Sequence, residues 1–174
     1  MRQLLTITFM LLMGFVSAQK IPTIQKTKFT KEVLSQTLEN TSGKNVTVKD
    51  ILSKHKGEVI VIDFWASWCR DCILALPKAE ELEKNNPNIT FLYFNLERSK
   101  EAFGKAISRF NMEDKNNYWF STGWKNKFND YIDLNWIPRY MVIDQKGDIA
   151  KYYAISPEDP DIQSTINKLT TTQE

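Results

Sequence analysis

Apolar residues along this chain fall into two kinds of pattern, and each kind predicts a type of element. Residues 59–65 and 89–96 are apolar at almost every position, which is typical of central strands covered on both faces. Shorter apolar segments bounded by turn residues predict further strands at residues 46–48, 118–120, 139–143 and 149–153. Gly147 between the last two suits a hairpin loop.

Helical spacing of apolar residues predicts the segments between and after these strands. A helix over residues 72–85 contains Pro77, which should kink it because proline lacks an amide donor. Ser99 is a good N-cap for a second helix, residues 125–132 predict a short third one, and Asp159 can cap the last. The stripes expected to face the core are Ala75, Ala79 and Leu82, then Phe103, Ile107 and Phe110, and finally Ile162, Ile166 and Leu169.

The resulting order is strand, helix, strand, helix, insert, strand, strand, helix. A βαβ half followed by a ββα half predicts an α/β fold, in which one sheet has helices on both faces. We expect the domain to span residues 41–170, after an extended lead-in over residues 19–40. Residues 171–174 are expected to be a frayed tail.

The first 18 residues form a segment of their own. Arg2 is followed by an apolar run over residues 4–16 and by the small-residue pattern Val16-Ser17-Ala18. This pattern predicts a signal peptide cleaved after Ala18, and hence an exported, periplasmic protein. The competing interpretation is an uncleaved N-terminal membrane anchor. Its 15 uncharged residues would span roughly 22 Å as a helix, whereas a bilayer core is about 30 Å thick.

Charge excludes some classes of partner. The formal net charge is +2 and falls to +1 without Arg2. A balance this close to zero gives no electrostatic argument for binding nucleic acid or an anionic membrane surface. The lysines at 49, 54 and 56 are interpreted as a solvated face.

Cys69 and Cys72 are the two cysteines of the chain, and they lie where a predicted strand and turn lead into a helix. A two-residue gap lets both sulfurs meet across one helical turn, so the pair can switch between dithiol and disulfide. At a helix start, free amide groups and the helix dipole favour the thiolate, which is the form that attacks a disulfide.

Two other roles suit this pair less well. Cysteines three positions apart close almost no loop, so their disulfide would add little to the stability of the fold. A zinc site needs four ligands, and His55 is the only histidine of the chain. We therefore predict redox chemistry and no metal.

Residues 64–72, read as Phe-Trp-Ala-Ser-Trp-Cys-Arg-Asp-Cys, resemble the thioredoxin superfamily, as does the later Ile137-Pro138 before a strand. Residues 43–72 and the insert after the second strand are more similar to the exported TlpA/ResA-like thiol-disulfide oxidoreductases. The resemblance covers residues 41–169. It implies a thioredoxin-like fold, with a central mixed β-sheet flanked by helices on both faces and an insert after the second βα unit.

The resemblance also implies roles for three residues. Cys69 would be the nucleophile, Cys72 would resolve the mixed disulfide, and no organic cofactor would be needed because the cysteine pair holds the electrons. Asp63 shares a strand face with Val61 and Trp65, so we expect a buried carboxyl with a raised pKa. It matches the buried acid of the family, which implies proton exchange with Cys72. The alternative is a structural aspartate at a strand end.

The resemblance further implies a cis Ile137-Pro138 bond close to the cysteines. The Ile137 backbone would then bind an extended substrate chain as an added strand does. The alternative is an ordinary trans proline that opens an edge strand.

Other residues near the motif are given smaller roles. Trp68 is expected to shield the sulfurs and to contact a partner, while Arg70 should favour the thiolate and Asp71 oppose it. Trp136 and Arg139 depart from the residues that are common in the family beside the Ile-Pro pair. A dense aromatic group is expected to be mostly core: Tyr118, Trp119, Phe120, Trp124, Phe128, Tyr131 and Trp136.

These observations favour a thiol-disulfide oxidoreductase that reduces exported proteins through its WCxxC motif. The resemblance implies oxidised exported proteins as substrates, with apocytochrome c as one candidate, and a membrane dithiol donor of the DsbD/CcdA type. A periplasmic disulfide oxidase or isomerase is the nearest alternative. A redox-silent thioredoxin-like binding module is another, although the presence of both cysteines argues against it.

Overall fold

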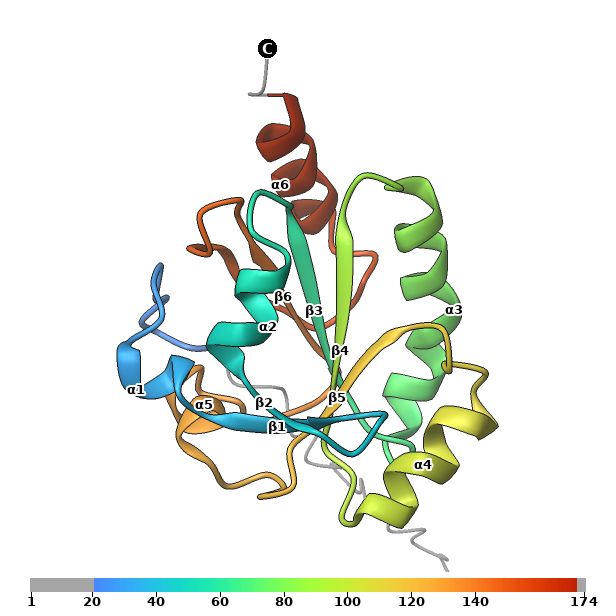
Figure 1. Cartoon of the computed structure of the whole chain (residues 1–174). Coiled ribbons are helices and arrows are strands. Elements are labelled where there is room, and N and C mark those ends of the chain that lie inside the picture. The colour runs from blue at the N-terminus through green and yellow to red at the C-terminus, as the bar shows by residue number, and fades with distance from the viewer. Residues whose placement is uncertain (1–20, 172–174) are drawn as a thin grey trace, which may run out of the picture.

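A computed structural model of the chain describes residues 21–171, so the predicted signal peptide and residues 172–174 of the expected tail lie outside the described residues. The described chain forms a seven-stranded sheet with the order β2-β1-β5-β4-β3-β6-β7 (Figure 1). The strands are β1 (Thr37–Asn40), β2 (Asn45–Thr47), β3 (Ile60–Trp65), β4 (Thr90–Asn95), β5 (Asn116–Trp119), β6 (Arg139–Ile143) and β7 (Ile149–Ala154). The helices are α1 (Lys31–Leu34), α2 (Val48–Lys54), α3 (Arg70–Asn85), α4 (Lys100–Arg109), α5 (Lys127–Tyr131) and α6 (Pro160–Thr171).

Strand β3 is the centre of the sheet. It pairs in parallel with β4, to which it is joined through α3, and antiparallel with β6. All six of its residues are buried, as its continuous apolar pattern predicts. The sheet is therefore mixed, which confirms the sequence prediction.

Helices cover both faces of this sheet (Figure 1). On one face, Tyr93 of β4 donates a hydrogen bond to Glu83 of α3. On the other face, the ring of Phe128 of α5 packs 6.0 Å from that of Phe64 and 5.9 Å from that of Phe94. Helix α6 lies beside α3, since Gln163 and Asn86 exchange hydrogen bonds. The expected two-sided architecture is confirmed.

The elements predicted from residue 46 onward agree with the structure to within two residues at each end. Ser99 caps α4 by accepting from the Ala102 amide. Helix α3 continues through Pro77 to Asn85. Strand β5 and helix α5 form the insert between α4 and β6, where irregular chain with a short strand and a short helix is expected.

The lead-in differs from the expectation of extended chain over residues 19–40. It contains α1, and β1 pairs with both β2 and β5, so the sheet begins at Thr37 rather than after residue 41. Helix α2 is also absent from the prediction. Leu38 and Val48 are fully buried, because these short elements complete the sheet edge and cover one of its faces.

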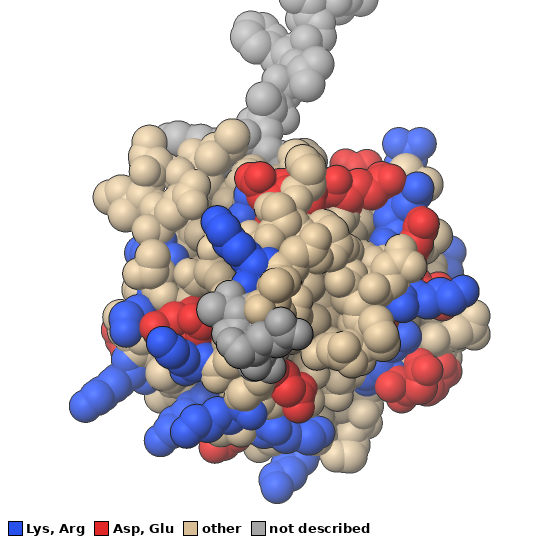
Figure 2. All heavy atoms as spheres, turned by 90° about the horizontal axis from the view of Figure 1, so that it is seen from above, with Lys and Arg blue, Asp and Glu red and all other residues tan. Residues whose placement is uncertain are grey.

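The face that Figure 2 shows carries charged groups of both signs, in keeping with the near-neutral charge of the sequence. Figure 2 looks onto the end of the molecule where the chain leaves α6, and basic and acidic side chains share that face. Within residues 21–171, no helix combines the length and apolar character needed to cross a bilayer.

Candidate redox site

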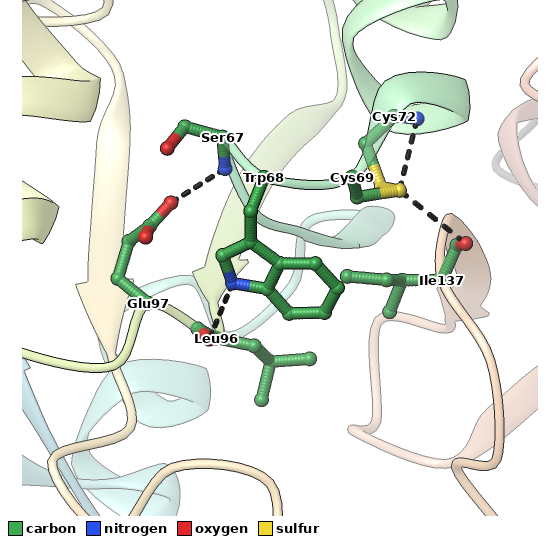
Figure 3. The surroundings of a disulfide bond; sticks show 7 residues. All are labelled: Ser67, Trp68, Cys69, Cys72, Leu96, Glu97 and Ile137. Atoms are coloured by element: carbon green, nitrogen blue, oxygen red, sulfur yellow. Dashed lines mark hydrogen bonds between the residues drawn. A yellow bond between two sulfur atoms is a disulfide. The ribbon is translucent and has the colours of Figure 1, made fainter.

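The cysteine pair lies where β3 passes into α3. Cys69 is the N-cap of α3, and its amide donates to the Ala66 carbonyl within the tight turn that follows Trp65. Cys69 and Cys72 form a disulfide with their Cα atoms 5.3 Å apart. The Cys72 amide donates to the Cys69 sulfur at 3.1 Å (Figure 3). This donor would equally favour a thiolate at Cys69 once the disulfide is reduced.

The two sulfurs differ in access. Cys69 keeps 8% of its surface exposed, whereas Cys72 keeps 1% and lies one turn into the helix. A partner can therefore reach Cys69 but not Cys72. Such an asymmetry suits a pair in which one thiol attacks and the other waits behind it.

Residues that directly follow β4 hold the turn before Cys69 in place through hydrogen bonds. The buried carboxylate of Glu97 accepts a hydrogen bond from the Ser67 amide (Figure 3). The Trp68 indole donates to the Leu96 carbonyl at 3.4 Å. In turn, the Glu97 carbonyl accepts from the Trp119 indole at 2.8 Å. These bonds fix the path of the chain into the cysteine pair.

A cavity of about 220 Å³ opens beside Cys69. Trp68 and Trp136 are 48% and 41% exposed, although most tryptophans in folded proteins are largely buried. The rings of Trp68 and Trp124 lie 6.4 Å apart. The residues that line the cavity are Trp68, Cys69, Arg70, Asp71, Trp124, Asn135, Trp136 and Ile137.

The Ile137-Pro138 peptide bond is cis, as the sequence resemblance implies. The Ile137 carbonyl oxygen lies 3.5 Å from the Cys69 sulfur (Figure 3). Ile137 also lines the cavity described above. The structure thus brings together residues that are 68 positions apart in the sequence.

Asp63 is buried in the middle of β3, as predicted. Burial raises the pKa of its carboxyl to about 7, and the Tyr140 hydroxyl opposes this shift. Asp63 lies on the face of the sheet that α3 covers, because its register partner Tyr93 bonds to Glu83 of that helix. A group that is part protonated near neutral pH can exchange protons with a thiol.

Arg139 is buried directly after the cis proline. The family resemblance leads us to expect a small or hydroxyl residue at this position. The Arg139 guanidinium donates to the Ile132 carbonyl at 2.9 Å and lies 4.1 Å over the ring of Tyr153. Burial lowers the pKa of Arg139 to about 10. This cation therefore ties the segment that leads to Pro138 onto β6 and β7.

The remaining predicted residues have simpler surroundings. Arg70 and Asp71 are exposed at the start of α3, beside the cavity. Of the aromatic group, Tyr118, Trp119, Phe120 and Phe128 are buried as expected, while Trp124 and Trp136 line the cavity. Residues 21–171 contain no cluster of three or more metal-ligating side chains.

Two residues of the site are missed by sequence reasoning. Glu97 supports the turn, and Tyr140 faces Asp63. Glu97 comes directly after a predicted buried strand. This position is the one signal in the sequence that Glu97 lies at the carboxyl end of the central strands. Tyr140 lies in a predicted strand, but its pairing with β3 is not visible in the sequence.

Comparison with known proteins identifies the family of this chain. Residues 57–149 match the family model described as thioredoxin-like. Thioredoxin H-type of Fagopyrum esculentum is 39% identical over 50 residues, which are 29% of this chain and 43% of that protein. Sporulation thiol-disulfide oxidoreductase A of Bacillus subtilis is 24% identical over 114 residues, 64% of this chain and 56% of that protein. The chain thus spans about half the length of these curated relatives.

Solved structures agree on the fold. A solution structure from Bacteroides vulgatus, provisionally assigned as a thiol-disulfide oxidoreductase, is 27% identical with a TM-score of 0.67. The match covers 83% of this chain and 91% of that one. The predicted thioredoxin-like fold is confirmed, and thiol-disulfide oxidoreductase is the enzyme class that these comparisons support.

Proposed function

Because this chain belongs to the thioredoxin-like family, we propose that it is an exported thiol-disulfide oxidoreductase that reduces disulfides of other exported proteins. The observation that carries the proposal is the Cys69–Cys72 pair at the start of α3. One of its sulfurs is reachable and receives an amide hydrogen bond, and the other is buried beside it.

The reaction begins with both cysteines reduced. The Cys69 thiolate attacks one sulfur of the substrate disulfide, forms a mixed disulfide and releases the other substrate sulfur as a thiolate, which takes up a proton from water. Cys72 then loses its proton and attacks the Cys69 sulfur, releasing the second substrate thiol. The substrate gains two electrons and becomes a dithiol, and Cys69–Cys72 becomes the disulfide.

Asp63 has a proton-transfer role in the second step. Its carboxylate takes the proton of the Cys72 thiol, through water, and so generates the attacking thiolate. Its pKa of about 7 supports this role, since the carboxyl is divided between both forms at neutral pH. On return of the pair to the dithiol, the same carboxyl gives the proton back.

The cavity beside Cys69 is proposed to bind the substrate chain. The Ile137 backbone lies next to the attacking sulfur and can pair with an extended peptide in the manner of an added strand. The exposed rings of Trp68 and Trp136 line this cavity and offer apolar contact. Arg70 and Asp71 at its rim would tune the thiolate weakly, because both are exposed to solvent.

Export and the reducing direction rest on the sequence. The leader over residues 1–18 supports secretion to the periplasm, and the TlpA/ResA-like resemblance supports reduction of exported proteins, with apocytochrome c as a candidate. A reductant outside the cytosol must be recharged. We therefore propose a membrane dithiol donor of the DsbD/CcdA type, which would be oxidised as Cys69–Cys72 is reduced.

The test is reduction of insulin by the mature protein with dithiothreitol as the electron source. Wild type should accelerate the reaction, and Cys69→Ser should reduce the rate to that of dithiothreitol alone. Equal rates for wild type and Cys69→Ser would identify a binding module instead. In Cys72→Ala the mixed disulfide on Cys69 should persist, so mass spectrometry of periplasmic extracts would identify the substrate, with Cys69→Ser as the control that traps nothing.

A second measurement decides the direction. Equilibration of the cysteine pair with glutathione gives its reduction potential. A reductant is expected to lie well below the value near −120 mV that is typical of strong oxidants. A potential near that value would replace the proposed reductase by an oxidase.

A further inference from the structure

Two tyrosines flank the buried carboxyl of Asp63. In the sheet, Asp63 of β3 is the register partner of Tyr93 of β4 on one side and of Tyr140 of β6 on the other. Register partners in neighbouring strands point to the same face of a sheet. The carboxyl therefore lies between two phenol rings, both of them buried.

The two hydroxyl groups have different surroundings. The Tyr93 hydroxyl donates its hydrogen to Glu83 of α3 at 3.1 Å, and Glu83 also pairs with Lys115 at 2.9 Å. The Tyr140 hydroxyl has no hydrogen-bond partner of ordinary geometry within residues 21–171, and neither has Oδ1 of Asp63. Tyr140 and Asp63 interact with each other, and within residues 21–171 neither the Tyr140 hydroxyl nor Oδ1 of Asp63 is engaged by another protein group.

We propose that Tyr140 is a positioning residue for Asp63, whose hydroxyl donates to the ionised carboxyl and keeps part of it ready to take the Cys72 proton at neutral pH. The inference rests on the proton-transfer role that the proposed function gives to Asp63. It adds a residue of β6, which lies far from both cysteines in the sequence but is paired with Asp63 in the sheet.

Burial is the larger influence on Asp63. It raises the pKa of the carboxyl, and the Tyr140 hydroxyl is the one group of residues 21–171 that lowers this pKa appreciably. The titratable groups around Asp63 include Tyr93 from β4 and Tyr140 from β6. Beyond Tyr93 lie Glu83 and Glu80 of α3, and Lys115, which pairs with Glu83. No lysine or arginine of the described chain offsets the burial of Asp63. Without the hydroxyl, a smaller share of the carboxyl would be ionised at pH 7.

The consequence concerns the resolving step. The Cys72 thiol transfers its proton to the Asp63 carboxylate, and the thiolate then attacks the Cys69 sulfur of the mixed disulfide. This step needs Asp63 in its ionised form. The fraction that is ionised therefore sets how fast the substrate thiol is released near neutral pH.

The experiment compares Tyr140→Phe with the matched control Tyr93→Phe in insulin reduction between pH 5.5 and 9.5. Each variant loses one buried hydroxyl beside Asp63, but only Tyr140→Phe removes the hydroxyl that donates to the Asp63 carboxyl. In Tyr140→Phe the midpoint of the rising limb should move up by about half to one pH unit, the size expected of one hydrogen bond. The rate at pH 7 should fall about two- to fivefold and should recover at high pH. In Tyr93→Phe the midpoint should stay in place.

A structural defect would give a different result. It would lower the rate at every pH, without recovery at high pH. An unchanged midpoint in Tyr140→Phe, or an equal shift in Tyr93→Phe, overturns the proposal. Should Tyr140→Phe not fold, carbon-13 NMR of the wild type replaces it: the Tyr140 ring should titrate with the Asp63 midpoint, and the absence of this titration overturns the proposal equally.

Asp63→Asn separates this inference from the proposed function. It should abolish the pH-dependent limb, and adding Tyr140→Phe to it should change nothing further. If Asp63→Asn keeps the limb, both the role of Asp63 and that of Tyr140 are wrong, while the Cys69→Ser control still tests the thiol chemistry by itself. If Asp63→Asn removes the limb and Tyr140→Phe leaves it in place, only the role of Tyr140 is wrong.

Discussion

A single carboxyl in the middle of the sheet has a cost for the folded state. Asp63 has an ordinary pKa of 3.8, and burial raises it to about 7 in the folded protein. Between these values the folded state holds a proton that the unfolded state has released. The free energy of unfolding therefore falls as pH rises through this window and levels off above the folded pKa. The same burial that suits Asp63 for proton exchange destabilises the fold at neutral pH.

Replacing Asp63 by asparagine should remove this pH-dependent cost. Asp63→Asn is expected to be more stable than wild type at pH 8, by at most roughly 4 kcal/mol, and the difference should shrink at pH 5. Urea unfolding at both pH values measures it. Asp114→Asn, at an exposed acid, is the control and should show no such trend. A difference of equal size at both pH values would contradict the linkage.

Among the elements, the sequence predicts every one from β3 onward, but only β2 of the four that precede β3. Strands β3 and β4 have six residues each and were evident as continuous apolar runs. Helix α2, with seven residues, and β1, with four, lie in a part of the chain that is polar and weakly patterned. The available signal for α2 was its cap, since the Thr47 side chain accepts from the Asp50 amide and Asp50 bonds back to Thr47.

The residues of the candidate site fall into two groups, those within one local motif and those that the fold brings beside it. Cys69, Cys72 and Asp63 fall in one short string, so the motif locates them together. Glu97 follows β4 and Tyr140 lies in β6, and the neighbours of both are decided by the packing of the whole sheet. Contacts of this kind depend on tertiary pairing, and no local pattern in the sequence encodes them.

The cap of α2 can be tested directly. Thr47→Ala should destabilise the protein by about 1 kcal/mol, because it leaves the Asp50 amide without its acceptor. Thr47→Ser keeps the hydroxyl and should recover most of the loss. Urea unfolding at pH 7 measures both variants. If serine is as harmful as alanine, the threonine methyl group and its packing, rather than the cap, stabilise this region.

At the scale of the whole molecule, the start of the described chain is bound to the loop that precedes the cis proline. The Lys26 ammonium group donates to the Tyr131 carbonyl and lies 3.3 Å from the Asp133 carboxylate and 3.4 Å from the Tyr152 hydroxyl. Arg139 holds the adjacent Ile132 carbonyl from within the core. The lead-in therefore braces the segment that carries Ile137 to the attacking sulfur.

Lys26→Met should release this brace. We expect a loss of about 1–2 kcal/mol in the free energy of unfolding, because three polar groups lose a partly buried cation. Limited proteolysis should also cut residues 21–29 sooner. Lys28→Met removes an exposed pair with Asp148 and should change neither measurement appreciably. Equal behaviour of the two variants would show that Lys26 has no special part in anchoring the lead-in.

The hydrogen bond from the Ser67 amide to Glu97 determines which residues position 67 can accept. Ser67 contributes its main-chain amide to this bond, so its hydroxyl is not needed for it. Alanine, threonine or lysine should thus be interchangeable at position 67 without displacing the cysteine pair. Proline alone lacks the amide hydrogen, and a single proline there would detach the loop from its acid as surely as the loss of Glu97 itself.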